Sequence, residues 1–464
     1  MEADMEARTQ TEDRLKRLTA QLSEWNYIPP RSTWTPADEA LYKPLDLLNV
    51  PLDEAQAMQL KAIKYAFKHH YTLSPFYGKY CDIKDVTPDD IKTHDDLEKI
   101  PLIPDLTFKA HPEGEDFAHW LANIYTGELP TLVVDTQDPT LDDIINACNS
   151  AGLVVVHSTG TSGRPSVIPR DQKTYLAQQY NYAKTHYSMW DDLDVDHTLS
   201  LFPQPTQTNM WAGKATVVMN ALCKDHQFAL DLEITVDGAL RAWTGKDERE
   251  GLQQRAEAMM RELFYKGTKW LERYENATDT IQLMAPPTLM TAYMDSLERM
   301  GKRFDFGERG RVRGGGGWKS MANERISQRD YMERIEEVLG IPPTHFEDGY
   351  SQGEVNALWS TCPEGHYYHA GYTCVKPLVL DKNLEPVGYG ERGRLACLDA
   401  LAHSYPGFIM SGDEVCLLEQ CPACDRPGPV LDHVIDRLAS EEMRGCAATI
   451  MGVFSRSLVQ AKRS

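Results

Sequence analysis

A short segment rich in serine, threonine and glycine carries groups suited to binding phosphate. Residues 158–166 read Ser-Thr-Gly-Thr-Ser-Gly-Arg-Pro-Ser. The hydroxyls can donate to phosphate oxygens, Gly160 and Gly163 let backbone N–H groups approach a ligand, and Arg164 adds a positive charge. The segment is not a Walker loop, because its two glycines are separated by two residues rather than four and no Gly-Lys-Ser/Thr follows. It predicts a polyphosphate cradle, and an ordinary Ser/Gly turn is the alternative.

Cysteine and histidine residues near the end of the chain form a second group with chemical potential. His366 follows Cys362 after three intervening residues, and Cys424 follows Cys421 after two. Each pair is spaced to bind one tetrahedral ion, so the four residues predict a closed, structural Zn²⁺ site. His369 competes with His366 for the fourth position. The alternative is that the four residues are incidental.

Composition limits the classes of partner. The 464 residues include 48 lysines and arginines against 69 aspartates and glutamates, which gives a formal charge of −21. That charge repels a nucleic-acid backbone, and the sequence has no run rich in lysine and arginine. No stretch reaches the roughly 18 apolar residues that cross a bilayer, and the charged N-terminus lacks the core of a secretory signal. Ten cysteines in a chain of this length are not a disulfide framework. We therefore expect a soluble, cytoplasmic protein that binds neither nucleic acid nor membrane.

The elements on either side of residues 158–166 must position that segment. Residues 153–156 read Leu-Val-Val-Val, which is typical of a strand buried on both faces of a mainly parallel sheet. Asp171 can cap a helix that follows. We therefore expect a strand, the phosphate loop and a helix in succession, an arrangement that binds phosphate. Beyond residue 378 the pattern changes to short strands joined by turns, at 378–380, 394–398 and 415–418.

Three motifs resemble, in the same order, those of the acyl-adenylate-forming superfamily of acyl-CoA synthetases, luciferases and peptide-synthetase adenylation domains. Residues 158–166 resemble its phosphate loop. Residues 348–354 (Asp-Gly-Tyr-Ser-Gln-Gly-Glu) resemble its Tyr-Gly-x-Thr-Glu segment, and residues 411–413 (Ser-Gly-Asp) its Thr-Gly-Asp. Residues 34–110 look more narrowly like the start of phenylacetate-CoA ligases and luminescence acyl-protein synthetases. The resemblance covers roughly residues 34–440.

The resemblance implies a role for each matched position. Tyr350 would stack on adenine, Glu354 would hold a Mg²⁺ ion that bridges phosphates, and Asp413 would accept both ribose hydroxyls. Taken singly, Tyr350 could instead be a core aromatic, Glu354 a surface acid and Asp413 part of a turn. The implied catalytic residues are Glu354, Arg164 and Cys446. The implied nucleotide-binding residues are Ser158, Thr159, Gly160, Thr161, Ser162, Gly163, Gly315, Gly316, Gly317, Asp348, Gly349, Tyr350, Ser351, Asp413 and Arg437.

The sequence departs from the family pattern in three places. Gly353 replaces the usual threonine, Trp318 follows the glycines where an acid is common, and residues 406–410 lack the arginine and tyrosine that usually precede Thr-Gly-Asp. None of the motifs gives the substrate. Apolar side chains that could line an acyl pocket, or else belong to the core, are Phe202, Met210, Trp211, Met284 and Trp318.

The segment after Arg437 is short compared with that of most relatives. Superfamily members usually continue from the hinge into a small lobe that carries a lysine for adenylation, whereas 27 residues follow Arg437 here. We expect this lobe to be missing or vestigial, as in the acyl-protein synthetases of bacterial luminescence. Those enzymes pass the acyl group through a cysteine near the C-terminus. The resemblance suggests the same route for Cys446, against the alternative of a structural thiol.

Together the patterns predict an α/β fold, the large domain of an adenylate-forming enzyme with parallel-sheet subdomains and a small β-rich region. The expected parts are a helical N-terminal segment at 1–145, a nucleotide-binding core at 146–376, a β-rich subdomain with the Zn²⁺ site at 377–436, and a vestigial hinge and tail at 437–464.

The predicted activity is ATP-dependent, AMP-forming activation of a carboxylic acid, aryl or fatty, to an acyl-adenylate. Charge develops on phosphate oxygens in that reaction, so loop dipoles, Arg164 and Mg²⁺ would stabilise it. ATP, Mg²⁺ and a structural Zn²⁺ are the expected cofactors. CoA, an amine or a protein thiol would accept the acyl group. The alternatives are a non-catalytic nucleotide- or acyl-binding module and a Zn²⁺-stabilised interaction protein, and the sequence leaves a homodimer open.

Overall fold

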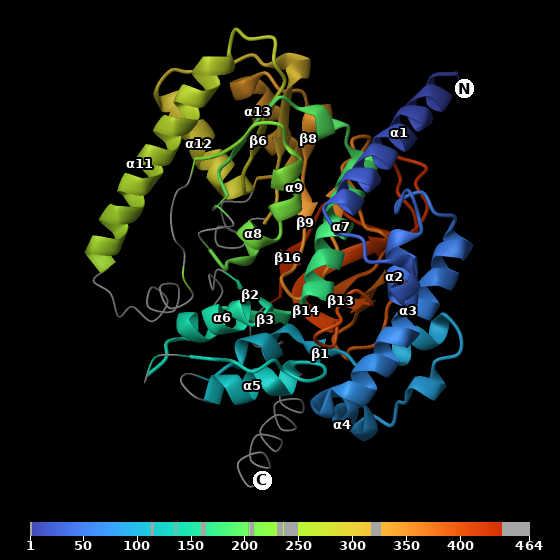
Figure 1. Ribbon diagram of the computed structural model, residues 1–464. Helices are drawn as coiled ribbons and strands as arrows, with labels where there is room; N and C mark the ends of the chain where they lie inside the picture. Colours follow the sequence, from blue (N-terminus) through green and yellow to red (C-terminus); the bar gives the residue numbers. More distant parts are fainter. Residues whose placement is uncertain are drawn as a thin grey trace.

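In the computed structural model, helices surround three β-sheets formed by the described residues (Figure 1). The structure describes residues 2–112, 116–134, 136, 138–158, 164–202, 204, 208–229, 235, 249–316 and 326–438. The helices are α1 (Glu2–Glu24), α2 (Pro36–Tyr42), α3 (Leu52–Leu73), α4 (Pro75–Ile83), α5 (Asp116–Ile124), α6 (Leu141–Ser150), α7 (Gln172–Met189), α8 (Trp211–Lys214), α9 (Val217–Leu222), α11 (Arg249–Tyr274), α12 (Pro287–Arg299) and α13 (Gln328–Leu339). Among the helices described, none is both long enough and apolar enough to cross a bilayer.

A parallel sheet of five strands forms the first structural core. Its spatial order is β5 (His226–Phe228), β4 (His197–Ser200), β6 (Ile281–Met284), β7 (Gly310–Arg313) and β8 (Phe346–Glu347). Helices α11, α12 and α13 pack beside it, in yellow and orange in Figure 1. The carboxyl ends of parallel strands meet at one edge of a sheet, which is where α/β proteins bind ligands.

A second, larger sheet is mainly antiparallel and lies in the carboxyl-terminal part of the chain. Its path is β12 (Val375–Leu380), β13 (Arg392–Asp399), β14 (Phe408–Leu418), β15 (Val430–Leu431), β11 (Tyr368–His369), β10 (Trp359–Thr361) and β9 (Gly349–Tyr350). Two further strands, β1 (Ile103–Pro104) and β16 (Asp436–Arg437), pair with β14. The strands expected at 378–380, 394–398 and 415–418 are confirmed.

The expected strand before the phosphate loop exists, but its partner differs from the prediction. Strand β2 (Val154–His157) pairs antiparallel with β3 (Val167–Arg170) in a two-stranded sheet. The prediction that this strand belongs to a larger parallel sheet is therefore wrong. The apolar residues Val167 and Ile168 lie on a strand just beyond the loop, and that strand pairs with β2. The loop thus joins two strands, and helix α7 begins only after β3. Asp171 caps α7 as predicted, accepting from the backbone N–H of Thr174 at 2.7 Å.

Helix α7 is buried along nearly its whole length although many of its residues are polar. Its polar side chains serve as supports for neighbouring loops. Asn181 accepts a hydrogen bond from the backbone N–H of Leu358 at 3.2 Å, and Gln179 accepts one from that of Val218 at 2.8 Å. Helix α7 also packs against α1, α2 and β10, and its His186 contacts Glu347 of β8, so it connects the N-terminal helices to both large sheets.

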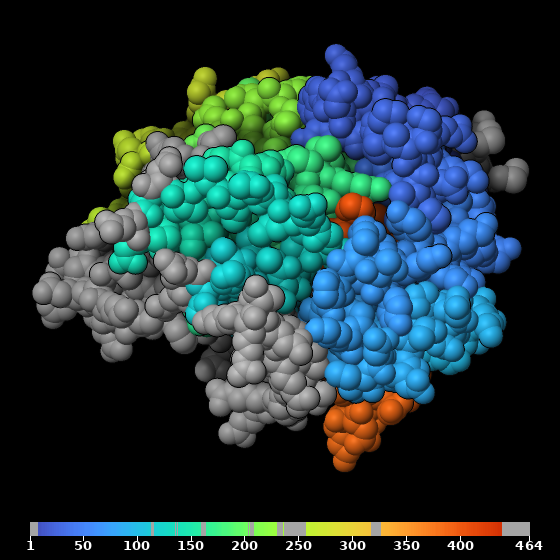
Figure 2. Space-filling model, turned by 60° about the horizontal axis from the view of Figure 1, so that its bottom comes forward, coloured from blue at the N-terminus to red at the C-terminus, as the bar shows by residue number. Residues whose placement is uncertain are grey.

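The N-terminal helices form one flank of this assembly. Leu15, Leu18 and Leu22 of α1 are buried in the main apolar core, which also includes residues of α2, α3 and α7. Figure 2 shows the N-terminal helices in blue beside the teal segment that contains α5 and α6, with an orange part of the carboxyl-terminal region projecting beyond the blue helices. The mixed α/β class, with a parallel sheet and an antiparallel β region, is confirmed.

Candidate active site

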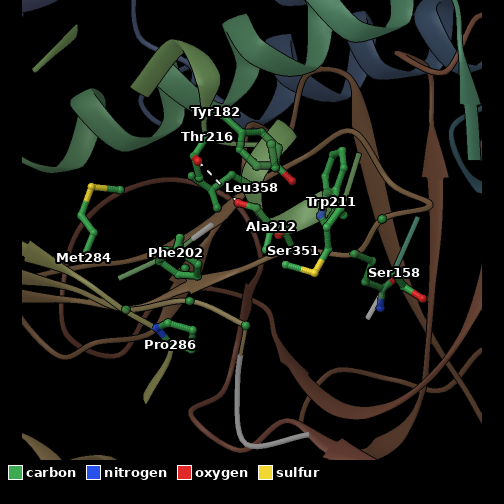
Figure 3. Close-up of a pocket in the computed structure, with 18 of the residues that line it drawn as sticks. Ser158, Tyr182, Phe202, Trp211, Ala212, Thr216, Met284, Pro286, Ser351 and Leu358 are labelled. Carbon is green, nitrogen blue, oxygen red and sulfur yellow. Dashed lines mark hydrogen bonds between the residues drawn. The ribbon is translucent and has the colours of Figure 1, made fainter. Parts of the chain in front are cut away.

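A cavity of about 430 Å³ lies where the two large sheets and the β2–β3 hairpin meet. Figure 3 shows part of its wall, with Ser158 on one side and Met284 on the other. Its walls include the carboxyl ends of β6, β7 and β8, together with helices α7, α8 and α9. Residues of the three predicted motifs line it, namely Ser158, Gly349, Ser351, Glu354, Ser411 and Asp413, as do the predicted residues Gly315, Gly316 and Arg437.

Asp413 is the centre of a hydrogen-bonded group at the polar end of the cavity. Its Oδ2 accepts from the hydroxyl of Tyr350 at 2.7 Å and from Nε2 of Gln352 at 3.1 Å. Its Oδ1 accepts from Nη1 of Arg437, on the neighbouring strand β16. A carboxylate has about four acceptor positions, so two ribose hydroxyls would have to displace one of these protein donors.

The structure brings Arg437 and Asp413 together although 24 residues separate them. Burial lowers the pKa of the Arg437 guanidinium, but the charges of Asp413, Asp105 and Glu354 outweigh burial and raise it. Tyr350 itself is not among the residues that line the cavity, whereas Gly349 and Ser351 are. Its proposed stacking on adenine stays a prediction.

Two charged residues missed in the sequence complete the polar end. Asp105 and Lys109 lie in the short 3₁₀ helix η4 (Asp105–Lys109), four residues apart, with Lys109 Nζ 3.6 Å from Asp105 Oδ2. Burial raises the pKa of the Asp105 carboxyl, Lys109 opposes this effect, and the nearby negative charge of Glu354 adds to it. Asp105 and Glu354 therefore face the same space as like charges, which is the environment that a divalent cation relieves.

The described edges of the phosphate loop are held together at its neck. The backbone N–H of Ser158 donates to the carbonyl of Ser166 at 3.0 Å, and the Ser158 hydroxyl accepts from the Ser166 N–H at 2.8 Å. Thr159, Gly160, Thr161, Ser162 and Gly163 lie outside the described residues. Arg164 lies near His111. Burial and the positive charge of Arg164 together lower the pKa of the His111 imidazole to about 4.

The glycine run forms a bare wall of the cavity where its residues are described. Gly316 has a φ of +88°, a conformation that favours glycine. A Cβ on Gly315 would lie 3.4 Å from the carbonyl oxygen of Gly349, so the two backbones approach closely. Gly317 and Trp318 lie outside the described residues.

A buried arginine supports the segment that carries Glu354. Arg170 ends strand β3, and its guanidinium lies 4.3 Å from the ring centroid of Trp211. It donates to the carbonyl of Gly353 and, from Nε, to Asn356 at 2.9 Å. These bonds hold the backbone carbonyl of Gly353 and the side chain of Asn356, which lie on either side of Glu354 in the sequence. The sequence offered one signal for this role, a lone charge in the apolar strand that follows the phosphate loop.

The opposite side of the cavity is apolar. Phe202 and Met284 line it, whereas Met210 and Trp211 line the wall beside the β2–β3 hairpin, where Met210 pairs with His157 and Trp211 packs on Arg170; the sequence analysis had named all four as possible lining residues. Figure 3 shows Phe202 and Met284 on the side away from Ser158. Apolar walls beside a few placed polar groups are typical of sites for small organic molecules.

A compact ion network borders this apolar side. Nε2 of His186 lies 2.6 Å from Asp192, and its Nδ1 lies 2.7 Å from Glu347. Arg313 contacts the same two carboxylates, at 2.6 Å and 2.9 Å. Burial and Arg313 lower the pKa of His186, but Asp192 and Glu347 outweigh them and raise it. The Arg313 guanidinium and the His186 imidazole thus lie against the same two carboxylates, and no motif in the sequence indicated this group.

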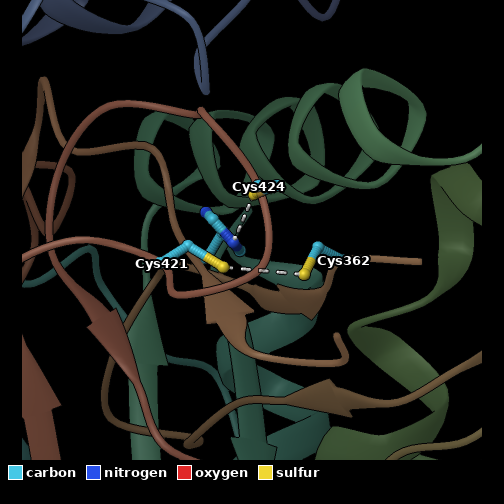
Figure 4. Close-up of side chains that lie close together, drawn as sticks. Cys362, Cys421 and Cys424 are labelled. Carbon is cyan, nitrogen blue, oxygen red and sulfur yellow. Dashed lines mark hydrogen bonds between the residues drawn. The ribbon is translucent and has the colours of Figure 1, made fainter. Parts of the chain in front are cut away.

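Away from the cavity, three thiols and one imidazole meet in a closed cluster (Figure 4). Cys362, Cys421, Cys424 and His369 bring their ligand atoms within 4.8 Å of one another. The Sγ atoms of Cys362 and Cys421 are 3.9 Å apart, and Sγ of Cys424 is 3.5 Å from Nε2 of His369. Tetrahedral Zn²⁺ at ordinary bond lengths sets these separations at about 3.8 Å and about 3.6 Å, so the residues fit the ion.

The cluster corrects the predicted fourth ligand. His366 is not part of it, and His369, the competing residue, is. The reason is local: Cys362 directly follows strand β10 and His369 lies on the paired strand β11, whereas His366 occupies the turn between the strands with a φ of +57°. The His366 ring instead lies 6.0 Å from that of Phe346.

The predicted nucleophile Cys446 lies outside the described residues, and the structure therefore leaves that role a prediction. Asp348 is described but does not line the cavity. Its carboxylate accepts from the hydroxyl of Tyr368 at 2.6 Å. The motif segment at 348–354 thus divides between residues that anchor it and residues that face the cavity.

Comparison with known proteins gives likenesses in sequence. Residues 260–455 match the family model described as acyl-protein synthetase, LuxE. A long-chain-fatty-acid–luciferin-component ligase of Aliivibrio fischeri is 22% identical over 409 residues, which cover 88% of this chain and 91% of that protein. Its namesake from Vibrio harveyi is 22% identical over 411 residues, covering 87% and 90%. A phenylacetate-coenzyme A ligase of Aromatoleum evansii is 45% identical over 50 residues, 11% of each chain.

Solved structures give likenesses in fold. A 2-hydroxyisobutyryl-CoA ligase in complex with 2-HIB-AMP and CoA superposes with a TM-score of 0.56 at 15% identity, covering 89% of this chain and 73% of that one. An open conformation of the same ligase gives 0.55 at 14% identity, with 89% and 74% covered. These comparisons confirm the resemblance to acyl-protein synthetases and phenylacetate-CoA ligases, and the fold of an adenylate-forming ligase.

Proposed function

We propose that the chain is an ATP-dependent, AMP-forming ligase that activates a carboxylic acid as its acyl-adenylate and transfers the acyl group. One observation carries this proposal. The acidic and basic groups of Asp105, Glu354, Asp413 and Arg437 meet at one end of a cavity whose other walls include the apolar side chains of Phe202 and Met284. A nucleotide and an organic acid need these two environments side by side. The likeness to acyl-protein synthetases supports the same activity.

The nucleotide would lie along the polar end. Asp413 would bind the ribose hydroxyls, with Arg437 or Gln352 yielding its place on the carboxylate. The glycines at 315–316 would pass along the adenine, because no side chain projects there. The Ser158–Ser166 neck would hold the phosphate loop against the polyphosphate.

Mg²⁺ fits the pair of carboxylates at Asp105 and Glu354. When bound, the ion would neutralise phosphate charge and withdraw electron density from the α-phosphorus. The chain supplies the rest of the environment. Lys109 and Arg437 add positive charge near the phosphates, and Arg170 holds the Glu354 backbone in place.

The proposed reaction has two steps. An oxygen of the carboxylate attacks the α-phosphorus of ATP, the bond to the β-phosphate oxygen breaks, and pyrophosphate leaves. An acceptor then attacks the acyl carbon of the acyl-adenylate, releases AMP and loses its proton. Preorganised donors around the α-phosphate stabilise the charge that develops there.

The acceptor is a thiol or an amine in this proposal. CoA, a soluble amine or a protein thiol would each complete the second step. Cys446 is the candidate protein thiol, because a thiolate attacks an acyl-adenylate readily. Hydroxylamine-sensitive acyl transfer to the chain itself, lost in Cys446→Ala, would be the sign of this route. Full product formation by Cys446→Ala with CoA or an amine, without an adduct on wild type, would contradict it.

We also propose that the cluster of Cys362, His369, Cys421 and Cys424 binds one structural Zn²⁺ ion. Its position supports this role. Cys362 and Cys421 pack with Met189 and Trp190, at the end of α7 and just beyond it. The ion would join the β10–β11 hairpin to the 421–424 turn at that point.

The function is tested by pyrophosphate release from ATP over a panel of aryl, fatty and amino acids, each with and without CoA or an amine. The proposal expects at least one acid to give pyrophosphate and AMP in equal amounts when an acceptor is present. ADP as the sole nucleotide product, with inorganic phosphate released in place of pyrophosphate, would contradict it. Binding of ATP without turnover of any acid would favour the non-catalytic module instead.

A further inference from the structure

A lysine whose donors are unused lines the polar end of the cavity. Lys109 ends the short helix η4, lines the cavity and keeps 15% of its side chain exposed. Its ion-pair partner is Asp105, and the 3.6 Å between Nζ and Oδ2 is too long for a hydrogen bond. Within the described part of the chain, the three donors of this ammonium are therefore left for a ligand.

The arginines of the cavity wall are already engaged. Arg313 donates to two carboxylates of the ion network, and Arg437 donates to Asp413. Among the lysines and arginines that the structure describes around the cavity, Lys109 is thus the one whose charge is not held by a hydrogen-bonded carboxylate. Its ammonium is the cation that the wall offers to an anionic substrate.

The backbone places Lys109 between the two parts of the nucleotide site. Strand β1 pairs in parallel with β14, so that Ile103 and Pro104 lie beside Ile409 and Met410, just before the Ser-Gly-Asp motif. Helix η4 follows β1 directly, and it packs against both β14 and β3, the strand just after the phosphate loop. Lys109 therefore belongs to an element that lies between the proposed ribose carboxylate and the loop.

Contacts on both sides hold this element in place. Phe108 is buried, and its ring centroid lies 5.5 Å from that of Tyr405. Two residues after Lys109, Nε2 of the buried His111 donates to the carbonyl oxygen of Pro165 at 3.0 Å. Pro165 belongs to the phosphate-loop segment. The backbone that carries the lysine is thus bonded to that segment and cannot shift away from it without breaking this bond.

The covalent order of ATP decides which group would meet this lysine. The α-phosphate lies between the ribose and the two terminal phosphates. With the ribose at Asp413 and the terminal phosphates at the loop, the α-phosphate falls beside η4. Adenylation brings a carboxylate against this anionic phosphate, and a fixed cation between the two anions offsets their repulsion. An ammonium with three unused donors can contact an oxygen of each.

We propose, on the basis of the acyl-adenylate function above, that Lys109 is a catalytic residue whose ammonium hydrogen-bonds a non-bridging oxygen of the α-phosphate and an oxygen of the attacking carboxylate. The carboxylate oxygen forms the new bond to the α-phosphorus. The bond from that phosphorus to the bridging oxygen breaks, and pyrophosphate leaves with the electron pair. Lys109 keeps its proton throughout. Because both contacts are made together only as the two anions meet, the lysine accelerates the reaction more than it tightens ATP binding.

The test is ATP–pyrophosphate exchange with the best acid of the panel, by the wild-type chain and by Lys109→Met. The variant should lower kcat by about 10²–10³-fold and raise the Kd for ATP by much less. Lys99→Met is the matched control and should exchange at the wild-type rate, since Lys99 pairs with Asp96 outside the cavity. A wild-type kcat in Lys109→Met, or a rise in Kd as large as the loss in kcat/KM, would overturn the proposal and leave the adenylation function intact. Exchange with no acid by the wild-type chain contradicts the function itself.

Sulfur substitution at the α-phosphate separates a contact at that group from a general effect of charge. The two diastereomers of ATPαS each replace one non-bridging oxygen by sulfur, which accepts hydrogen bonds weakly. The wild-type chain should use one diastereomer less efficiently than the other, and the ratio of their kcat/KM values should fall several-fold in Lys109→Met. An unchanged ratio would show that Lys109 does not touch the α-phosphate and would overturn the proposal. If thermal melting shows that Lys109→Met is unfolded, Lys109→Arg decides, because it keeps the charge and alters the geometry of the donors. A changed ratio in that variant supports the contact, and an unchanged ratio overturns it.

Discussion

The polar end of the cavity and the Cys/His cluster both gather residues from distant parts of the chain, yet they differ in how their polar atoms are used. In the cavity, the carboxylates of Asp105 and Glu354 lie beside open space, with Lys109 and Arg437 within 3.6 Å and 3.8 Å of Asp105. In the cluster, three thiols and His369 face one another beside a small apolar group, and Sγ of Cys421 also accepts from the backbone N–H of Ala423 at 3.4 Å. The first arrangement leaves charged groups open to a ligand, whereas the second suits a permanently bound metal ion. Variants of the cavity should therefore change turnover, and variants of the cluster should change stability.

The largest expected effect comes from the cluster. Cys421→Ser should release the metal and lower the midpoint of thermal unfolding by many degrees, because structural Zn²⁺ contributes folding free energy outright. Turnover per folded molecule should change little at a temperature where the variant is folded. Metal content by mass spectrometry and melting by calorimetry measure both parts. Cys223→Ser, outside the cluster, is the control. Wild-type protein without metal but with the same melting behaviour as the metal-bound form would contradict the closed-site assignment.

The next effect concerns the cavity. Glu354→Gln removes one charge from the proposed Mg²⁺ pair and should slow adenylation by about 10²–10³-fold, the scale for one lost electrostatic contact to a transition state. The melting temperature should stay near that of wild type. Glu385→Gln, at an exposed turn, is the matched control. Exchange of pyrophosphate at the wild-type rate in Glu354→Gln would remove this residue from the site.

A smaller effect is expected at Asp413. Asp413→Ala should weaken ATP binding by about 2 kcal/mol, because the ribose hydroxyls lose their acceptor. Tyr350, Gln352 and Arg437 lose the same acceptor. Calorimetric titration with ATP measures this change. An unaltered Kd for ATP would show that the carboxylate anchors β16 alone and does not contact the nucleotide.

The smallest expected effect tests the helix that connects the two regions. Burial lowers the pKa of Lys184 on α7 to about 8, against 10.5 for the free side chain. The unfolded chain binds this proton more tightly than the folded chain does. Below pH 8 the buried charge of Lys184 therefore lowers the free energy of unfolding by its full amount, and this destabilisation disappears as pH rises from about 8 to 10.5. Lys184→Met should therefore raise the free energy of unfolding at pH 7 by about 1–2 kcal/mol, after the loss of the bond from Nζ to Thr19. Denaturant unfolding at pH 7 and pH 10 checks this sign. A gain that grows with pH would contradict it.

The sequence predicted the motif residues that line the cavity better than it predicted their surroundings. Glu354 and Asp413 could be predicted because each belongs to a short motif whose spacing is specific. Asp105 and Arg170 could not, since their roles depend on contacts with residues far along the chain. Asp105 pairs with Lys109 locally, but nothing in that spacing places it beside Glu354. The charge network at Arg313 was missed for the same reason.

Local pairing explains the two corrections. The apolar run at 153–156 was assigned to a parallel sheet, but the Val167–Arg170 strand just after the loop pairs with it first. His366 has the better spacing from Cys362 for a metal ligand, yet the hairpin between β10 and β11 brings His369 back to the cluster instead. In both cases, the sequence pattern identified the segment, and a short antiparallel pairing decided which residues lie together.

Oxygen-isotope transfer tests the central claim most directly. The best acid from the panel is labelled with ¹⁸O in its carboxylate and incubated with the protein, ATP, Mg²⁺ and an acceptor, and the nucleotide product is then examined by mass spectrometry. Attack of the carboxylate on the α-phosphorus predicts one ¹⁸O atom in each AMP and none in pyrophosphate. Label in inorganic phosphate, or AMP without label, would contradict the formation of an acyl-adenylate in this cavity.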